Sequence, residues 1–180
     1  MDITDIISTS SKLVSRVASD RKRYLYDRIY WEQPMLCIKG PRGVGKTTLM
    51  LQRMRESALG EAALYVSLDH LWFSQHRLIE LVEYHYSHGG THIFVDEVHR
   101  YPYRNWMQEM KNIYDSYPGY HVVFSGSSLL KIDMSIADLS RRCMFYDMQG
   151  LSFREYLGFA GIAHFEAYTL DEVLANHQAI

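Results

Sequence analysis

The sequence predicts an α/β fold in which helices sandwich a parallel β-sheet. Short apolar runs, typical of buried strands, alternate along the chain with longer segments of helical periodicity. Glycine and proline mark turns between them, as at Gly89-Gly90 and Pro118-Gly119. Such alternation is typical of βαβ units, in which a helix joins each strand to a parallel neighbour.

Each predicted element of the sheet rests on a local pattern. The run Met35-Leu36-Cys37-Ile38 is entirely apolar and predicts a first, buried strand. AALYVSL, THIFVDEV and YHVVF predict strands over residues 62–68, 91–98 and 120–124, and a fifth is expected over 142–148. Apolar residues at helical spacing predict connecting helices over residues 48–59, 75–86 and 104–117.

Helices are also expected at both ends of the chain. Apolar residues predict a helix over residues 2–18, with Ser8–Ser11 expected to interrupt it. A second helix, mixed basic and aromatic, is expected over residues 21–30, and Pro34 ends it. Ser152 and Glu155 have the spacing of a capping box, so a further helix is expected there.

The composition excludes several classes of protein. A chain of 180 residues, 47% of them apolar, can fold around a core, and its net charge of -2 argues against coating of nucleic acid by bulk charge. Binding of nucleic acid by a local basic patch is left as an alternative. Two cysteines exclude a disulfide framework and fit a reducing cytosol, so we expect a cytoplasmic protein. No apolar stretch approaches the roughly 20 residues that span a bilayer, and the N-terminus is not expected to be a secretory signal.

The run GPRGVGKT, residues 40–47, is the most specific motif in the chain. It matches G-x-x-x-x-G-K-[ST], in which glycines let backbone N–H groups approach phosphate oxygens. Lys46 is expected to reach the β- and γ-phosphates, and the Thr47 hydroxyl to ligate Mg²⁺. A plain glycine-rich turn needs neither residue. The candidate nucleotide-binding residues are Gly40, Pro41, Arg42, Gly43, Val44, Gly45, Lys46, Thr47 and Thr48.

Two adjacent acids end the predicted strand Ile93-Phe94-Val95, which gives Asp96 and Glu97 the form of a Walker B element. Asp96 is expected to hold Mg²⁺, and Glu97 to orient and deprotonate an attacking water. Two acids at the end of a buried strand are costly unless a cation is near, which Mg-nucleotide supplies. A solvated strand end is the plainer alternative. The second acid and the absence of Asn-Lys-x-Asp argue against a GTPase.

Polar residues after the fourth strand and arginines before the fifth complete the candidate site. Ser127, and after it Ser125, is placed to touch the γ-phosphate or the attacking water, although helix-capping serines are the alternative. Arg142, beside Arg141, is a candidate arginine finger, in cis or from a neighbouring chain. A solvated charge pair is the alternative for these arginines.

Together these motifs resemble the prokaryotic AAA+-like ATPases of the ASCE division. The resemblance rests on GPRGVGKTTLM, FVDEVHRYPYRNW, FSGSSLL and LSFREYL, and it covers about residues 20–160. Trp106 matches a tryptophan of that family, and Arg142 matches its arginine. Arg141 stands where the family has glycine, and Gly150 where it has proline.

The resemblance implies a strand order of 5-1-4-3-2 in a P-loop NTPase sheet, with ATP and Mg²⁺ as ligands. It places the strand that ends near Ser125 between those that begin at Met35 and Thr91. Three parts are expected: an N-terminal helical segment over residues 1–30, a P-loop ATPase core over 31–150, and the start of a truncated C-terminal helical region over 151–180.

Other polar clusters are weaker candidates. His85, His88 and His92 are expected to be surface histidines rather than zinc ligands. His99 is a candidate for contact with substrate or a neighbouring subunit. The run Arg21-Lys22-Arg23 is expected to be a solvated helix face, with contact to adenine or nucleic acid as the alternative.

Three functions follow from these motifs. The first is Mg-dependent ATP hydrolysis by Lys46, Thr47, Asp96 and Glu97 that drives conformational change or assembly. The second is a nucleotide-gated binding module with little turnover. The third is a small-molecule kinase with Arg141 and Arg142 as its lid. A protein partner or self-association is expected, and nothing in the sequence identifies a nucleic-acid partner.

Overall fold

The computed structural model describes residues 2–103, 105–126, 139, 141–164 and 168–176. The chain divides into two compact units, Met1–Gly150 and Leu151–Ile180. The first contains the sheet and the predicted nucleotide-binding motifs.

Five parallel strands form the sheet: β1 (Met35–Lys39), β2 (Ala63–Ser67), β3 (His92–Asp96), β4 (His121–Gly126) and β5 (Met144–Asp147). Their spatial order is β2-β3-β4-β1-β5, which confirms the predicted order and the place of β4 between β1 and β3. In register, Ile38 lies opposite Ser125 and Ser67 opposite Asp96. The carboxyl ends of the central strands therefore meet at one edge.

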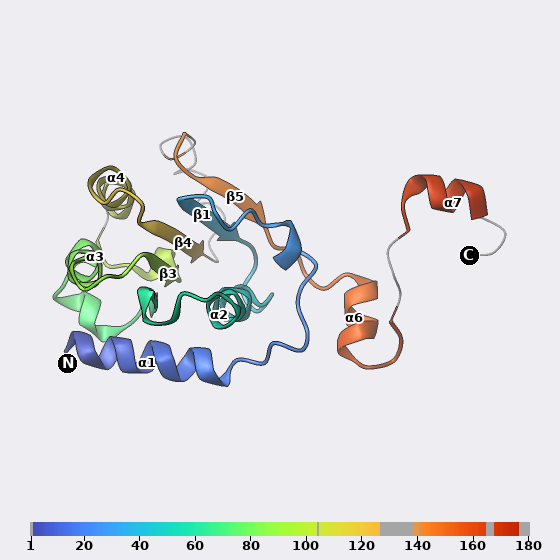
Figure 1. The fold of residues 1–180 in the computed structure, drawn as a ribbon, viewed down its shortest axis with the longest axis horizontal. Coiled ribbons are helices and arrows are strands. Elements are labelled where there is room, and N and C mark those ends of the chain that lie inside the picture. The colour runs from blue at the N-terminus through green and yellow to red at the C-terminus, as the bar shows by residue number, and fades with distance from the viewer. Residues whose placement is uncertain (1, 104, 127–138, 140, 165–167, 177–180) are drawn as a thin grey trace. The chain divides into compact units, whose positions relative to one another are not determined.

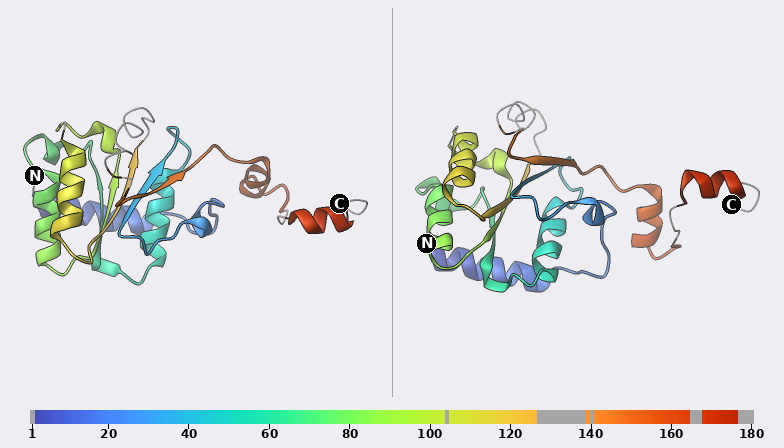
Figure 2. Two further views of the ribbon diagram at one scale, coloured as in Figure 1. Left: turned by 90° about the horizontal axis from the view of Figure 1, so that it is seen from above. Right: turned by 45° about the horizontal axis from the view of Figure 1, so that its top comes forward.

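Helices cover both faces of the sheet (Figures 1 and 2). The helix α2 (Lys46–Glu56) lies on one face, and α3 (Leu78–Ser87) and α4 (Trp106–Ser116) lie on the other. The helix α1 (Ile3–Arg16) runs past the β2 edge of the sheet. The predicted α/β sandwich is confirmed, although α3 and α4 each begin two or three residues later than expected.

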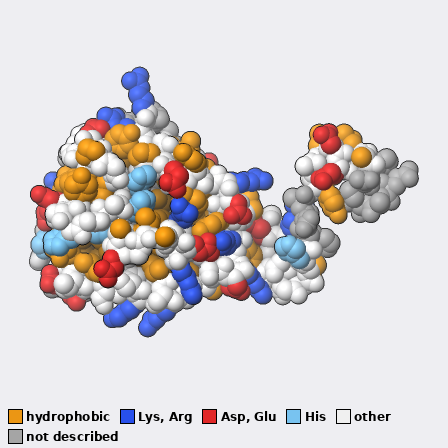
Figure 3. Space-filling model, in the orientation of Figure 1, with side chains coloured by type: hydrophobic (Ala, Val, Ile, Leu, Met, Phe, Trp, Pro, Cys, Tyr) orange, Lys and Arg blue, Asp and Glu red, His pale blue; other side chains and the backbone are white. Residues whose placement is uncertain are grey.

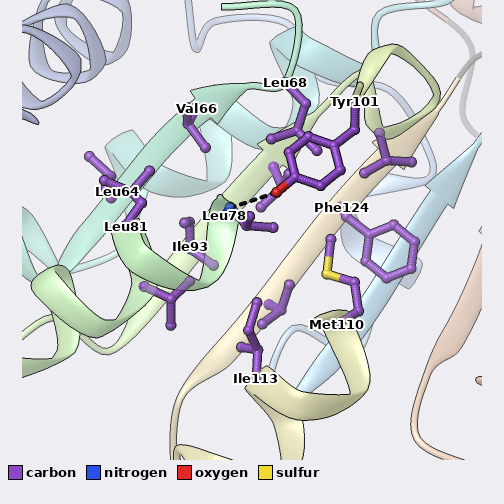
Figure 4. Close-up of a cluster of buried hydrophobic side chains, with 14 of the residues drawn as sticks. Leu64, Val66, Leu68, Leu78, Leu81, Ile93, Tyr101, Met110, Ile113 and Phe124 are labelled. Carbon is purple, nitrogen blue, oxygen red and sulfur yellow. Dashed lines mark hydrogen bonds between the residues drawn. The ribbon is translucent and has the colours of Figure 1, made fainter. Parts of the chain in front are cut away.

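Alternating strand residues form the two halves of the core. Leu64, Val66, Ile93 and Phe124 point toward α3 and α4, while Leu36, Ile38, Phe94 and Val123 pack with α2. Figure 4 shows the first half, in which the hydroxyl of Tyr101 accepts a hydrogen bond from the Leu78 N–H at 2.7 Å. The period of two along each strand buries apolar side chains on both faces of the sheet.

The helix α1 continues through its serines, where an interruption was expected. The Ser10 side chain is buried and its hydroxyl oxygen accepts a hydrogen bond from the Tyr65 N–H at 2.9 Å. Ser11 donates its hydroxyl to the Ile7 carbonyl within the helix at 3.1 Å. Ser10 thus satisfies a backbone donor on the edge strand β2, which explains a polar residue on the buried side of α1.

The prediction of a helix over residues 21–30 is wrong. This segment contains only a short 3₁₀ turn, Tyr26–Arg28. The side-chain amide of Gln52, on α2, donates hydrogen bonds to the carbonyls of Ala18 and Arg21, both at 2.8 Å. The Arg21 carbonyl is one that a helix over residues 21–30 would have used for its own bonds, so a tertiary contact replaces local helical pairing there.

The prediction of surface histidines is wrong for His85. Its side chain is buried, with Nδ1 2.7 Å from the Tyr120 hydroxyl and Nε2 3.4 Å from the Glu61 carbonyl. Burial lowers the pKa of His85. The ring also lies directly beneath Gly90, where an added Cβ would come within 2.4 Å of three ring atoms.

The second unit contains two short helices, α6 (Phe153–Phe159) and α7 (Leu170–Asn176). The predicted capping box is present at α6, because the Ser152 hydroxyl accepts from the Glu155 N–H while the Glu155 carboxylate accepts from the Ser152 N–H. Thr169 and Glu172 make the same reciprocal pair at the start of α7. Both helix starts are thus encoded locally.

Charged side chains of both signs are interspersed on the face of the first unit that Figure 3 shows. No broad field of one sign covers that face, in keeping with the net charge of -2. Among the described residues, no helix is long and apolar enough to cross a membrane.

Candidate functional site

The glycine-rich loop connects the end of β1 to the start of α2, as predicted. Gly43 and Gly45 adopt left-handed backbone conformations, with φ of 84° and 100°, which glycine adopts without steric cost. Gly40 has a different role, because a Cβ there would come within 2.2 Å of the Met148 carbonyl oxygen. The loop residues Pro41, Arg42 and Gly43 are exposed to solvent.

Lys46, the first residue of α2, is buried although it carries a charge. Its ammonium group donates hydrogen bonds to the carbonyls of Gly40 at 2.9 Å and Pro41 at 2.8 Å. Burial lowers its pKa, while the carboxylates of Glu97 and Asp96 act in the opposite direction. The lysine therefore lies folded against the loop, close to both candidate acids.

Asp96 is at the centre of the site, at the end of β3, with only 2% of its surface exposed. Its carboxylate accepts hydrogen bonds from the hydroxyls of Thr47, Ser125 and Tyr65 and from the N–H of Glu97. Four donors from α2, β4, β2 and its own strand end satisfy the buried charge. The structure therefore brings Lys46 and Thr47 of the glycine-rich motif together with Asp96 of the second motif.

Tyr65 is the member of this group that sequence reasoning missed. Its hydroxyl donates to Asp96 Oδ2 at 3.0 Å, and burial together with the Asp96 charge raises the pKa of the phenol. It remains protonated and acts as a donor. Tyr65 is read in the sequence as one apolar residue of a strand, and only the register with β3 brings its hydroxyl to Asp96.

Glu97 has an unusual backbone conformation directly after β3. Its φ of 56° and ψ of 43° place it in the left-handed region, where no other non-glycine residue of the described chain lies. Its carboxylate oxygen Oε2 lies 3.1 Å from Nε2 of His99. Backbone strain of this kind concentrates at functional sites. His99, a candidate for substrate contact, thus contacts the carboxylate of Glu97.

Of the remaining predicted residues that the structure describes, Ser125 belongs to the site and Arg142 does not. Ser127 is outside the described residues, and Ser125 is the serine that contacts Asp96. Arg142 binds Asp115 through two hydrogen bonds of 3.1 Å and lies before β5, at the amino ends of the strands. A five-residue strand is roughly 16 Å long, so Arg142 does not reach the loop that follows β1 of its own chain.

The donor atoms fit Mg²⁺ better than a transition metal. The Thr47 hydroxyl and the Asp96 carboxylate are hard oxygen donors at one point beside the loop, the type that Mg²⁺ prefers. Within the described part of the chain, no group of three or more His, Cys, Asp and Glu side chains is placed to hold a metal ion.

A parallel sheet of order 2-3-4-1-5, a glycine-rich loop between β1 and α2, and an Asp-Glu pair at the end of β3 define a P-loop nucleotide-binding domain of the AAA type. A family model described as an AAA domain matches residues 32–157, and the chain belongs to this family.

No curated protein matches the sequence. Among solved structures, the chain is similar to that of C. elegans PCH-2, with 14% sequence identity and a TM-score of 0.47. The match covers 95% of this chain and 51% of the other, so the chain spans about half the length of that structure.

Proposed function

We propose that this chain hydrolyses ATP in the presence of Mg²⁺ and uses the hydrolysis to drive a change in conformation or assembly. The observation that supports this most is the hydrogen bond of Thr47 to Asp96, with Glu97 next in the chain. It puts a hydroxyl, a carboxylate and a second acid beside the glycine-rich loop. Hydrolysis needs such a set at one place.

The residues take separate roles in this proposal. The N–H groups of residues 43–48 bind the phosphates at the start of α2, and the Lys46 ammonium group moves from the loop carbonyls to the β- and γ-phosphate oxygens. Thr47 and Asp96 would hold Mg²⁺, which neutralises phosphate charge when bound. Glu97 orients the attacking water and accepts its proton. Ser125 keeps Asp96 in place, and a contact of Ser127 with the γ-phosphate remains part of the proposal.

Arg142 is proposed to act in trans. Arg142 lies at the amino ends of the strands, and the glycine-rich loop lies at their carboxyl ends. Arg142 can therefore contact a γ-phosphate only in the site of a neighbouring chain. Self-association is therefore part of the proposed mechanism. Cys37 and Cys143 are buried and form no disulfide, which supports a cytoplasmic setting.

The test is phosphate release from Mg-ATP by the purified chain over a wide range of protein concentration. Activity per molecule that rises with concentration, and that Arg142→Ala abolishes, supports hydrolysis in an assembly. Activity that is measurable but independent of concentration places a complete site within one chain and removes the role of Arg142. Transfer of the γ-phosphate to an organic acceptor instead of water would favour the kinase.

One observation favours a nucleotide-gated binding module as the second candidate. Glu97 is held against His99 while Asp96 is bonded to four donors, an arrangement that suits a resting state. In this function ATP stays bound and sets the conformation. Tight binding of ATP without phosphate release at any protein concentration would favour it.

A further inference from the structure

Arg23 is a buried arginine at the back of the glycine-rich loop. Only 7% of its surface is exposed, although it belongs to a basic run that the sequence places on a solvated helix face. One terminal nitrogen of its guanidinium donates to the Val44 carbonyl, and the other donates to the carbonyls of Gln149 at 2.9 Å and Gly150 at 3.0 Å. One side chain thus joins the loop to residues that follow it by more than 100 positions.

The segment that carries Arg23 is fastened along α2, the helix that begins at the loop. Gln52 binds the carbonyls of Ala18 and Arg21, as described above. Further bonds from this segment reach Glu56, the last residue of α2: Lys22 forms a salt bridge with it at 2.6 Å, and the Tyr26 hydroxyl donates to it at 2.7 Å. Arg23 therefore starts from a backbone that is fixed relative to α2, and the direction of its side chain toward Val44 is set by that anchorage.

The bond to Val44 has a direct consequence for phosphate binding. The peptide that joins Val44 to Gly45 is planar and trans, so its C=O and N–H point in opposite directions. Because Arg23 holds the Val44 oxygen on one side, it fixes the direction of the Gly45 N–H on the other. This peptide turns about ψ of Val44 and φ of Gly45, and a glycine at the second position leaves it freer to rotate without such a contact.

The bonds of Arg23 to Val44 on one side and to Gln149 and Gly150 on the other are called the clamp below. The side of the clamp at Gln149 and Gly150 lies where the first unit ends. The Met148 N–H donates to the Lys39 carbonyl at 2.7 Å, and the Met148 carbonyl oxygen lies against Gly40. Arg23 then binds the next two carbonyls along the chain, those of Gln149 and Gly150. The chain passes into the second unit directly after Gly150.

We propose that Arg23 is a positioning residue of the nucleotide site, which orients the Gly45 N–H toward the phosphates and couples the state of the loop to residues 149–150. The proposal rests on the proposed function, since it assigns the loop to phosphate binding. Through this coupling, nucleotide binding restrains the segment that leads into the second unit.

The test compares Arg23→Met with Arg21→Met. Arg21 comes from the same basic run, and about half of its side-chain surface is exposed. MgADP affinity is measured by calorimetry, and amide hydrogen exchange is measured with and without MgADP at equal fractional occupancy. The wild-type chain and Arg21→Met are expected to show slower exchange on MgADP binding at residues 40–48 and at 148–152.

In Arg23→Met we expect about tenfold weaker MgADP binding, because a charge-assisted bond that orients a phosphate donor is lost. Slower exchange should be confined to residues 40–48. Unchanged affinity, or slower exchange that persists at 148–152, overturns the proposal. Should Arg23→Met fail to fold, Arg23→Lys carries the test with the same expectation, because one ammonium group does not replace a planar fork that spans three carbonyls.

The ligand-free proteins separate this proposal from the proposed function. If wild-type chain does not bind MgADP, the proposed nucleotide-binding function is wrong. The clamp itself still predicts faster exchange at residues 44–46 and 148–152 in ligand-free Arg23→Met than in ligand-free Arg21→Met. Equal exchange rates in the two variants overturn the clamp.

Discussion

The hydroxyl of Thr47 donates a hydrogen bond to the carboxylate of Asp96, which joins the first turn of α2 to the end of β3. The two residues come from separate motifs, 49 positions apart in the sequence. A hydroxyl that gives its proton to a carboxylate keeps its lone pairs for a cation. The pair is therefore already arranged as two oxygen ligands on one side of the loop.

Thr47→Ala should weaken the binding of Mg-ATP by about tenfold or more, while Thr47→Ser stays close to the wild-type chain. Serine keeps the hydroxyl, and alanine removes both the metal ligand and the bond to Asp96. The free energy of unfolding should fall by only about 0.5–1.5 kcal/mol, because Asp96 keeps three other donors. Calorimetric titration with and without Mg²⁺ measures the first effect. Equal affinity of Thr47→Ala and Thr47→Ser for Mg-ATP would contradict the role of the hydroxyl.

Gly90→Ala should destabilise the first unit by about 1–3 kcal/mol, because the new Cβ overlaps the buried ring of His85. The ring is held between Tyr120 and Glu61 and does not move aside freely. Chemical denaturation measures the loss. Gly158→Ala is the control, since a Cβ there meets nothing within 4 Å.

A double variant makes the same prediction sharper. His85→Ala removes the ring, so the further addition of Gly90→Ala should cost much less than it does in the wild-type background. An equal cost of Gly90→Ala in both backgrounds would show that the ring is not the cause.

Acid should destabilise the first unit through His92. Burial, with smaller contributions from the charges of His121, Arg53 and His85, lowers the pKa of His92 to about 4. Its ring also stacks on that of His121, with centroids 4.4 Å apart. Since an unfolded histidine has a pKa near 6.5, the unfolded chain binds the proton more tightly. Stability that is fully present above pH 6.5 is therefore lost as the pH falls toward 4.

His92→Gln should reduce this acid sensitivity by about 1–2 kcal/mol between pH 7 and pH 4, a figure that allows for solvent screening of a half-buried ring. Denaturation of both proteins at several pH values measures the difference, and the carboxylates that titrate in the same range are common to both. Parallel stability curves for the two proteins would exclude His92 as the cause.

The parts of the fold that could be predicted from sequence are those with local signatures. The strands are apolar runs, the loop between β1 and α2 is a contiguous motif, and Ser152 with Glu155 specifies a helix start within four residues. The order of the strands came from resemblance to a known family, because no local pattern determines which strands are neighbours. Asp96 and Glu97 can be recognised in the sequence because two acids directly follow an apolar strand.

The parts that could not be predicted depend on contacts between distant segments. Gln52 binds the Arg21 carbonyl, which the helix expected over residues 21–30 would have used, and Arg23 turns inward to reach Val44. Tyr65 reaches Asp96 only through the register of β2 with β3. None of these residues differs in type from an ordinary surface or core residue, so only the assembled fold reveals its role.

The most direct measurement is phosphate release from Mg-ATP by the Glu97→Gln variant beside the wild-type chain, with ATP binding measured in both. The variant is nearly isosteric and removes the carboxylate that accepts the proton of the attacking water. We expect unchanged ATP affinity, and phosphate release at least about 100-fold slower than in the wild-type chain. Phosphate release at the wild-type rate from Glu97→Gln would contradict the role of Glu97 and the hydrolytic mechanism built on it.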